Sequence, residues 1–222
     1  MTLCVYAIAS RPARPPAAIG LAGERLQIVS EGPIAAIAGE LSRPPRPSAR
    51  HLQRYDAAVQ NLAAHLPSVL PARFGTCVES RDELAFVLRS RRRSLQRALA
   101  HVRNRVQMTI RIVDGGSAAR NSDAGSPSRE PEAGPGAAYL RARADAAARA
   151  RQVPGFEPVR DAVQRWVRDE RVERHAGVTT VYHLVPRASV EAYRRAAARA
   201  ASQTDVNLIL TGPWPAYAFA QV

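Results

Sequence analysis

The first hundred residues of the chain combine short apolar runs with polar turns, a pattern that predicts strands before helices. Three strands are expected, at Leu3–Ala9, Leu26–Ser30 and Ile34–Ala38, and the Glu31-Gly32-Pro33 turn separates the last two. A proline-rich run at 43–47 follows. Because proline lacks an amide hydrogen, this run belongs to neither a helix nor a central strand.

Apolar residues then recur at spacings of three and four, which places them on one face of a helix. Ser48 is the expected N-cap of this helix, and Pro67 ends it. The predicted apolar face consists of Leu52, Tyr55, Val59, Leu62 and Leu66.

A short strand, a long helix and another strand are predicted next. The first strand covers Val69–Arg73, and the helix begins at Ser80, where Glu83 completes a capping box. The strand after the helix, Val106–Val113, alternates between apolar and polar positions. Arg91 falls close to the apolar stripe of the helix, and the periodicity does not account for it. The stripe itself is formed by Leu84, Leu88, Leu95, Leu99 and Val102.

The composition changes sharply after these elements. Residues 114–136 are rich in Gly, Ser, Pro and charge, and such a segment buries too little apolar area to offset the entropy of ordering it. We expect a flexible linker there, followed by an Ala-rich helix at 137–152, a second helix, a strand, a helix capped by Ser189 and a last strand. The second helix carries Phe156, Val159, Val163 and Trp166, and the two strands cover Val178–Val185 and Val206–Leu210.

This order of elements predicts an α+β protein with two domains. Residues 1–113 are expected to form an N-terminal domain in which two helices pack on one face of a sheet, as in a ferredoxin-like fold. Residues 114–136 are the predicted linker. Residues 137–222 are expected to form a smaller, ferredoxin-like-derived α+β domain that ends in a tail rich in Trp and Pro.

Length and composition fit a folded protein that does not span a membrane. The chain has 222 residues, and its apolar content of 46% is enough to build a core. Arg, Glu, Gln or Pro interrupts every apolar run before it reaches the roughly 20 residues of a membrane helix. The first residues lack the basic flank and cleavage site of a secretory signal, so we expect a cytoplasmic protein without a membrane partner.

The chain offers few residues for metal binding. Cys4 and Cys77 both lie in apolar stretches, so we expect two buried free thiols in place of a disulfide. The histidines lie far apart and form no HxxxH or HExxH pattern, which favours surface or edge positions over metal ligation. They are His51, His65, His101, His175 and His183.

No pattern of catalytic residues emerges either. Catalysis would need a nucleophile beside a base, or a pair of carboxylates with separated pKa values. The phosphate-binding patterns GxGxxG and GxxxxGK[ST] are absent, and Gly134-Pro135-Gly136 follows the linker instead of a strand. We expect no enzymatic activity and no cofactor.

The formal net charge of +13 first suggests a nucleic acid partner. All basic residues are Arg, however, and beside abundant Ala and Pro this composition is also typical of GC-rich codons. Only Arg89–Arg97 is densely basic, which a solvated helix face explains, and the 5% of aromatic residues do not accompany it. An RNA-binding module is therefore the alternative hypothesis, and binding to an acidic protein surface stays open.

Two motifs exceed what folding alone requires. The first motif is residues 70–76, in which Gly75 is expected to have an unusual backbone angle. Its candidate binding residues are Arg73, Phe74, Gly75 and Thr76. The structural alternative is that the motif only forms a tight turn between strand and helix. The second is the C-terminal segment 210–219. Its rigid, apolar sequence is expected to dock on its own domain or on a partner, and its candidate binding residues are Pro213, Trp214, Pro215 and Tyr217.

These two motifs resemble those of the gas vesicle protein F/L family. Further matching pieces are Val5-Tyr6-Ala7, residues 136–140 after the linker, and Leu184-Val185, so the resemblance spans nearly the whole chain. The chain departs from the family pattern at Tyr55-Asp56, where a His-Glu pair is common, and at 215–217, where Pro-Ala-Tyr replaces Pro-Pro-Tyr.

The resemblance implies a two-domain protein, with a ferredoxin-like N-terminal domain, that takes part in gas vesicle formation. It implies contacts with the small hydrophobic shell protein and with other gas vesicle accessory proteins, and neither enzymatic activity nor a cofactor. From it we expect an assembly factor or minor structural component located at the gas vesicle in the cytoplasm, for which nucleic acid is not the expected partner.

Overall fold

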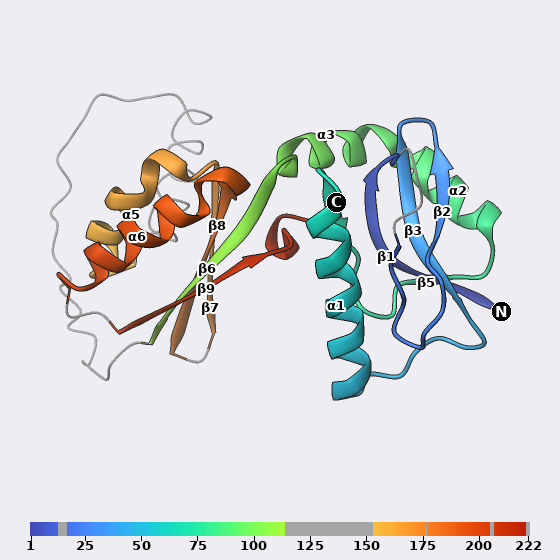
Figure 1. Ribbon diagram of the computed structural model, residues 1–222, viewed down its shortest axis with the longest axis horizontal. Coiled ribbons are helices and arrows are strands. Elements are labelled where there is room, and N and C mark those ends of the chain that lie inside the picture. Colours follow the sequence, from blue (N-terminus) through green and yellow to red (C-terminus); the bar gives the residue numbers. More distant parts are fainter. Residues whose placement is uncertain (13–16, 114–152, 176, 205–206, 221–222) are drawn as a thin grey trace, which may run out of the picture.

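Two antiparallel sheets lie side by side in the computed structural model, each covered by helices (Figure 1). The structure describes residues 1–12, 17–113, 153–175, 177–204 and 207–220. The predicted linker at 114–136 and the predicted helix at 137–152 lie outside these ranges. The α+β class predicted from the sequence is confirmed.

The first sheet is built from the N-terminal strands in the order β2-β3-β1-β4, and β5 also pairs with β1. The three strands predicted first are all present, and the predicted strand at 69–73 ends earlier, at Pro71. The strands are β1 (Thr2–Ser10), β2 (Gln27–Glu31), β3 (Ile34–Leu41), β4 (Val69–Pro71) and β5 (Cys77–Val78).

Helices cover both faces of this sheet, so the expectation that two helices share one face is wrong. α1 (Ala49–His65) packs with Tyr6 and Ile37 on one face, whereas α2 (Arg81–Ser90) and α3 (Arg92–Val102) pack over the other face. The physical reason is that β1 and β3 are buried almost continuously and do not alternate between buried and exposed positions. Strands that are apolar on both faces need cover on both.

The helix predicted after Ser80 is divided at Arg91, which has φ −102° and ψ 10°. Each part keeps its buried leucines, and Arg91 itself is exposed at the break. This position explains why the arginine did not fit the apolar stripe of a single straight helix. The predicted N-cap is confirmed, because the Ser80 hydroxyl accepts a hydrogen bond of 3.1 Å from the Glu83 amide.

The second sheet has the order β7-β8-β6-β9 and contains a strand that we had placed in the first domain. β6 (Arg105–Val113) pairs with β8 and β9, so its assignment to the N-terminal sheet is wrong. β7 (Asp169–His175) was not predicted, because its charged sequence gives no apolar alternation. The other strands are β8 (Val178–Pro186) and β9 (Leu208–Trp214). The domain boundaries at 113 and 136 and the ferredoxin-like description stay predictions.

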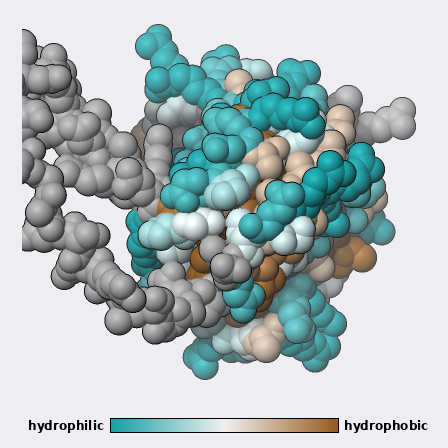
Figure 2. Space-filling view, turned by 90° about the vertical axis from the view of Figure 1, so that its left-hand side faces the viewer, coloured by the Kyte–Doolittle hydropathy of each residue, from teal (hydrophilic) through white to brown (hydrophobic). Residues whose placement is uncertain are grey.

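The helices of the second half pack on β6, β8 and β9 around one apolar core. Phe156, Val159 and Val163 are buried there, as predicted, but Ser189 makes no side-chain capping bond. Figure 2 looks onto this end of the molecule and shows hydrophilic residues over most of the face. The helical elements are α5 (Glu157–Val163), η1 (Gln164–Trp166), η2 (Arg187–Ser189) and α6 (Val190–Ala201).

A polar network is enclosed in this second core. His183 is fully buried, and its ring nitrogens lie 2.7 Å from the Tyr193 hydroxyl and 2.9 Å from a Glu170 carboxylate oxygen. Arg160 donates to the same oxygen at 3.0 Å. Burial alone would raise the pKa of Glu170, but the hydrogen bonds from His183 and Arg160 lower it below its ordinary value. The network therefore satisfies polar groups that an apolar core would otherwise leave unpaired.

The C-terminal tail crosses from the second sheet to the first. After β9, the short helix η3 (Tyr217–Phe219) buries Phe219 in the core formed by the first sheet with α2 and α3. The Tyr217 hydroxyl donates to Asp56 on α1 at 2.6 Å, and the Ala218 amide donates to Gln107 at 2.8 Å. The tail was expected to dock on its own domain or on a partner, but it docks against the first sheet and α1, outside the predicted domain at 137–222 (Figure 1).

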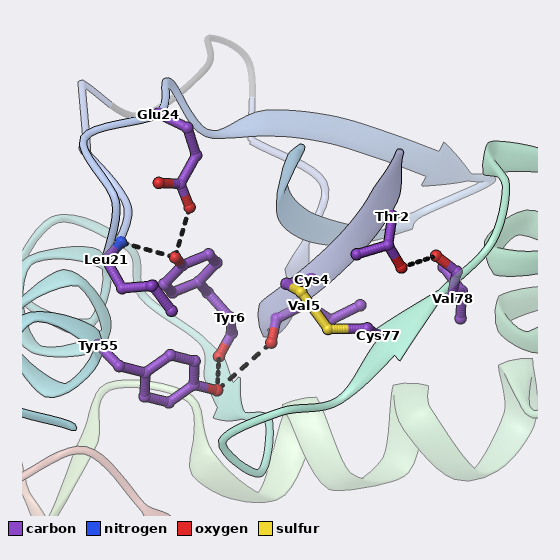
Figure 3. The surroundings of a disulfide bond; sticks show 9 residues. All are labelled: Thr2, Cys4, Val5, Tyr6, Leu21, Glu24, Tyr55, Cys77 and Val78. Carbon is purple, nitrogen blue, oxygen red and sulfur yellow. Dashed lines mark hydrogen bonds between the residues drawn. A yellow bond between two sulfur atoms is a disulfide. The ribbon is translucent and has the colours of Figure 1, made fainter. Parts of the chain in front are cut away.

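A disulfide joins Cys4 and Cys77, so the expectation of two free thiols is wrong. The two residues lie directly opposite each other where β1 pairs with β5 (Figure 3). Their apolar surroundings suggested ordinary core positions, and the two-residue strand that brings Cys77 against Cys4 gave no signal in the sequence. The bond closes a chain segment with a sequence separation of 73 residues.

Removing the disulfide should destabilise the protein. We expect the Cys4→Ala/Cys77→Ala double variant to lose about 2–4 kcal/mol of unfolding free energy, because the unfolded chain gains loop entropy. Guanidinium denaturation with and without reductant checks this. Reductant should weaken the original chain and leave the double variant unchanged; two titratable thiols in the unreduced, unfolded chain would contradict the structure.

Removing the tail's hydroxyl should also lower stability. Tyr217→Phe removes the donor to one oxygen of the half-buried Asp56 carboxylate and leaves only Gln60 on the other oxygen, so we expect a loss of about 1–2 kcal/mol in denaturant unfolding. Tyr182→Phe is the matched control, because it removes a tyrosine–carboxylate bond to Glu173 at an exposed site and should cost less than about 0.5 kcal/mol. Equal losses in the two variants would refute the importance of tail docking.

The Glu170 network predicts a pH dependence. Since the folded-state pKa of Glu170 lies below its unfolded value, its stabilising contribution is present above that unfolded value and is lost as pH falls through the folded pKa. The stability difference between the original chain and Glu170→Gln should therefore be largest near neutral pH and shrink in acid. Urea denaturation at several pH values measures it, and a pH-independent difference would contradict this assignment.

Candidate partner-binding groove

The two sequence motifs meet in a groove at the open edge of the first sheet. β4 is the last strand of that sheet, and the groove extends along it between α1, the α2–α3 break and the tail. Its volume is about 1260 Å³. We call it the β4 groove. Its lining includes Ile8, Leu52, Tyr55, Asp56, Leu70, Pro71, Ala72, Arg73, Phe74, Thr76, Arg91, Leu95, Tyr217 and Ala220.

Backbone hydrogen bonds to β1 hold the turn of the first motif at both ends. The Ala72 amide donates to the Tyr6 carbonyl at 2.9 Å, and the Val5 amide donates to the Thr76 carbonyl at 2.8 Å. Between them, Gly75 has a φ of 82°, which confirms the predicted unusual backbone angle. The disulfide at Cys77 follows immediately. The turn is therefore fixed relative to the sheet, as a preformed binding surface requires.

Aromatic side chains pack against one another beneath the turn and hold it against α1 and β1. Tyr55 of α1 stacks on Tyr6 with ring centroids 4.9 Å apart, and Phe74 packs edge-on against Tyr55 at 5.4 Å. The Tyr55 hydroxyl donates to the Ala72 carbonyl at 2.8 Å and also lies near the Val5 and Tyr6 carbonyls (Figure 3). Burial raises the pKa of Tyr55, so the hydroxyl stays protonated and keeps its role as donor.

The predicted residues of the first motif lie where a partner can reach them. Arg73 and Thr76 are exposed at the rim of the β4 groove, and Phe74 is half-buried in its wall. Gly75 shapes the turn and is absent from the lining. The structural alternative of a tight turn and the binding hypothesis are thus compatible, because the turn itself presents these side chains.

The residues of the second motif separate into two places. Tyr217 lines the β4 groove, whereas Pro213, Trp214 and Pro215 line a smaller cavity of about 240 Å³ beside the end of α1. Arg187 of η2 spans that cavity by donating to backbone carbonyls of Ala63 and Ala64. The Trp-Pro residues therefore belong to the junction of the two sheets, and only Tyr217 joins the first motif.

Leu52, Asp56 and Arg91 are among the lining residues that the sequence analysis did not identify. Leu52 was assigned to the buried face of α1 but is 46% exposed, and the buried face begins one turn later at Tyr55. Asp56 and Arg91 come from separate elements, and only the fold brings them to one groove. A signal existed for one of them, since Arg91 was the residue that the helical periodicity could not explain.

The β4 groove offers an apolar floor with charged groups at its rim, which suits binding of a polypeptide segment. Nowhere in the described residues do three His, Cys, Asp or Glu side chains gather in a way that could hold a metal ion. Among the same residues, no helix combines the length and apolar composition needed to cross a membrane.

Comparison with known proteins agrees with the resemblance seen in the motifs. Residues 2–221 match the model of the family described as "Gas vesicle synthesis protein GvpL/GvpF". The crystal structure of the gas vesicle protein GvpF from Anabaena sp. PCC7120 is similar, with a TM-score of 0.77 at 14% identity over 100% of this chain and 96% of that one. GvpF from Microcystis aeruginosa gives a TM-score of 0.76 at 12% identity, covering 100% and 99% of the two chains.

At these identities the two crystal structures establish the fold only. The sequence matches none of the curated proteins. The family model covers nearly every residue, including both motifs, 70–76 and 210–219. The chain therefore belongs to the GvpL/GvpF family of gas vesicle synthesis proteins.

Proposed function

We propose that this chain is an accessory or minor structural protein that binds the hydrophobic shell protein through the β4 groove during gas vesicle formation. Membership of the family implies a role in gas vesicle formation. The location that follows from the proposal is the gas vesicle in the cytoplasm, with other gas vesicle accessory proteins as further partners.

One observation supports the groove as the binding surface. Positions 74 and 217, one in each of the two motifs, lie 143 residues apart along the chain, yet the fold brings Phe74 and Tyr217 to the same groove. Phe74 and Tyr217 both pack against the core around Tyr55 and still border the groove, so a partner bound in the groove would contact both motifs.

The chemistry of the groove fits a partner that exposes apolar surface. A shell subunit must expose such surface before it polymerises, and a protein that covers it limits aggregation. Leu52, Phe74 and Leu95 offer apolar contacts in the groove. Pro71 lies in the edge strand β4 and has no amide hydrogen to offer an added strand, so side-chain docking is favoured over β-augmentation.

We also propose that the chain is not an enzyme. The cluster that most resembles a catalytic group, His183 with Glu170 and Tyr193, lies in the interior of the second core, where His183 has no exposed surface. A substrate could not reach it without opening the core. The network acts instead on stability, as its pH dependence will test.

The alternative function, RNA binding, has weaker support. Arg165 lies 3.9 Å from the centre of the Trp166 ring, so this aromatic face is occupied by the chain's own guanidinium. A phosphate-binding protein would lose affinity steeply as salt rises, which separates the two functions in one titration.

A pair of exposed apolar residues tests the proposal. Leu52 lines the β4 groove at 46% exposure, whereas Phe86 on α2 is 66% exposed and is absent from the lining. We expect Leu52→Glu to reduce capture of the purified shell protein at least about tenfold, because it replaces an apolar contact in the interface by a charged side chain that must lose water, and Phe86→Glu to leave capture within about twofold.

The same variants should act in cells. Loss of the gene should abolish or deform gas vesicles under the electron microscope, and Phe86→Glu should restore them better than Leu52→Glu. Normal vesicles without the gene, or no capture of shell protein by the unaltered chain, would refute the proposed function.

A further inference from the structure

We infer that the β4 groove recognises an amphipathic segment of the shell protein that carries a carboxylate, and that Arg73 and Arg91 are the residues that bind this carboxylate. The inference rests on the proposed function and adds the chemistry of the partner. It follows from which charges line the groove and which of them are already paired.

The two arginines reach the groove from different elements. Arg73 follows β4 in the turn that β1 holds in place, and Arg91 lies at the break between α2 and α3. Both side chains are exposed, and neither guanidinium has a hydrogen bond or ion pair with any described residue. Nearby Arg89, in contrast, is paired with Glu31 at 3.2 Å.

The acidic residue in the lining does not neutralise these arginines. Asp56 accepts hydrogen bonds of 2.6 Å from the Tyr217 hydroxyl and of 2.6 Å from the Gln60 amide, one on each oxygen, so both oxygens of this carboxylate already have partners. Two guanidinium groups therefore face one carboxylate that is engaged elsewhere. The rim of the groove keeps a net positive charge, in line with the formal charge of +13 for the chain.

The combination of an apolar floor and unpaired arginines decides what kind of segment fits. A wholly apolar segment would cover Leu52 and Phe74 but would also desolvate guanidinium groups without giving them a partner, which is unfavourable. A segment with apolar residues on one face and Asp or Glu beside them would cover the apolar floor and also give the guanidinium groups a partner. Arginine is suited to this role because its planar fork can bind a carboxylate through two parallel hydrogen bonds.

Charge reversal tests the inference with matched variants of the full chain. Arg73→Glu and Arg91→Glu should each weaken capture of the purified shell protein at least about tenfold. Arg93→Glu changes the net charge equally at an exposed position outside the lining, and its capture should stay within about twofold of the unaltered chain. Arg73→Gln and Arg91→Gln, which remove charge without adding repulsion, should give intermediate losses; thermal unfolding verifies that all variants are folded.

A compensating change in the partner identifies the carboxylate. Replacing each Asp and Glu of the shell protein in turn by Arg should reveal at least one variant that restores binding to Arg73→Glu or Arg91→Glu. If the unaltered chain captures shell protein but the groove variants bind as well as Arg93→Glu, the inference fails while the proposed function stands. If the unaltered chain captures none, the proposed function fails and the inference falls with it.

Discussion

The groove depends on the docking of the C-terminal tail against the first sheet. Phe219 is buried in a core that otherwise consists mainly of β1, β3, α2 and α3, and Arg171 of β7 lies 5.3 Å from its ring centre. The Tyr217–Asp56 hydrogen bond fixes the tail to α1. Without these contacts, the edge of β4 would lose one wall, and the two sheets would lose the segment that joins their cores.

A second constraint sets where the groove opens. Because β1 and β3 are buried on both faces, helices must cover the sheet on both sides, and the edge at β4 is left between them. The disulfide and the hydrogen bonds from β1 fix the turn at this edge. The groove is therefore a consequence of core burial, and Arg73, Phe74 and Arg91 give it the charge and the apolar surface on which the proposed binding depends.

Local signals in the sequence predicted local structure well. The caps at Ser48 and Ser80, strands β1 to β4 and the angle at Gly75 depend on neighbouring residues and were predicted. Pairing between residues far apart in the sequence was not predicted. The strand that forms β6 was assigned to the wrong sheet, and the Cys4–Cys77 bond was missed because it depends on the register between two strands. The same limit applies to the groove. The motifs identified four of its residues, Arg73, Phe74, Thr76 and Tyr217. They did not identify Leu52, Asp56 or Arg91, because only the fold brings these residues close to the motifs.

The most direct test of the account is to ask what touches the groove while vesicles form. A photo-crosslinking amino acid placed at position 52 in the full chain, and at position 86 as the control, would label whatever lies against each side chain in vesicle-forming cells. The account predicts that the shell protein is crosslinked from position 52 and not from position 86. Equal crosslinking from both positions, or shell protein crosslinked from position 86 alone, would contradict it.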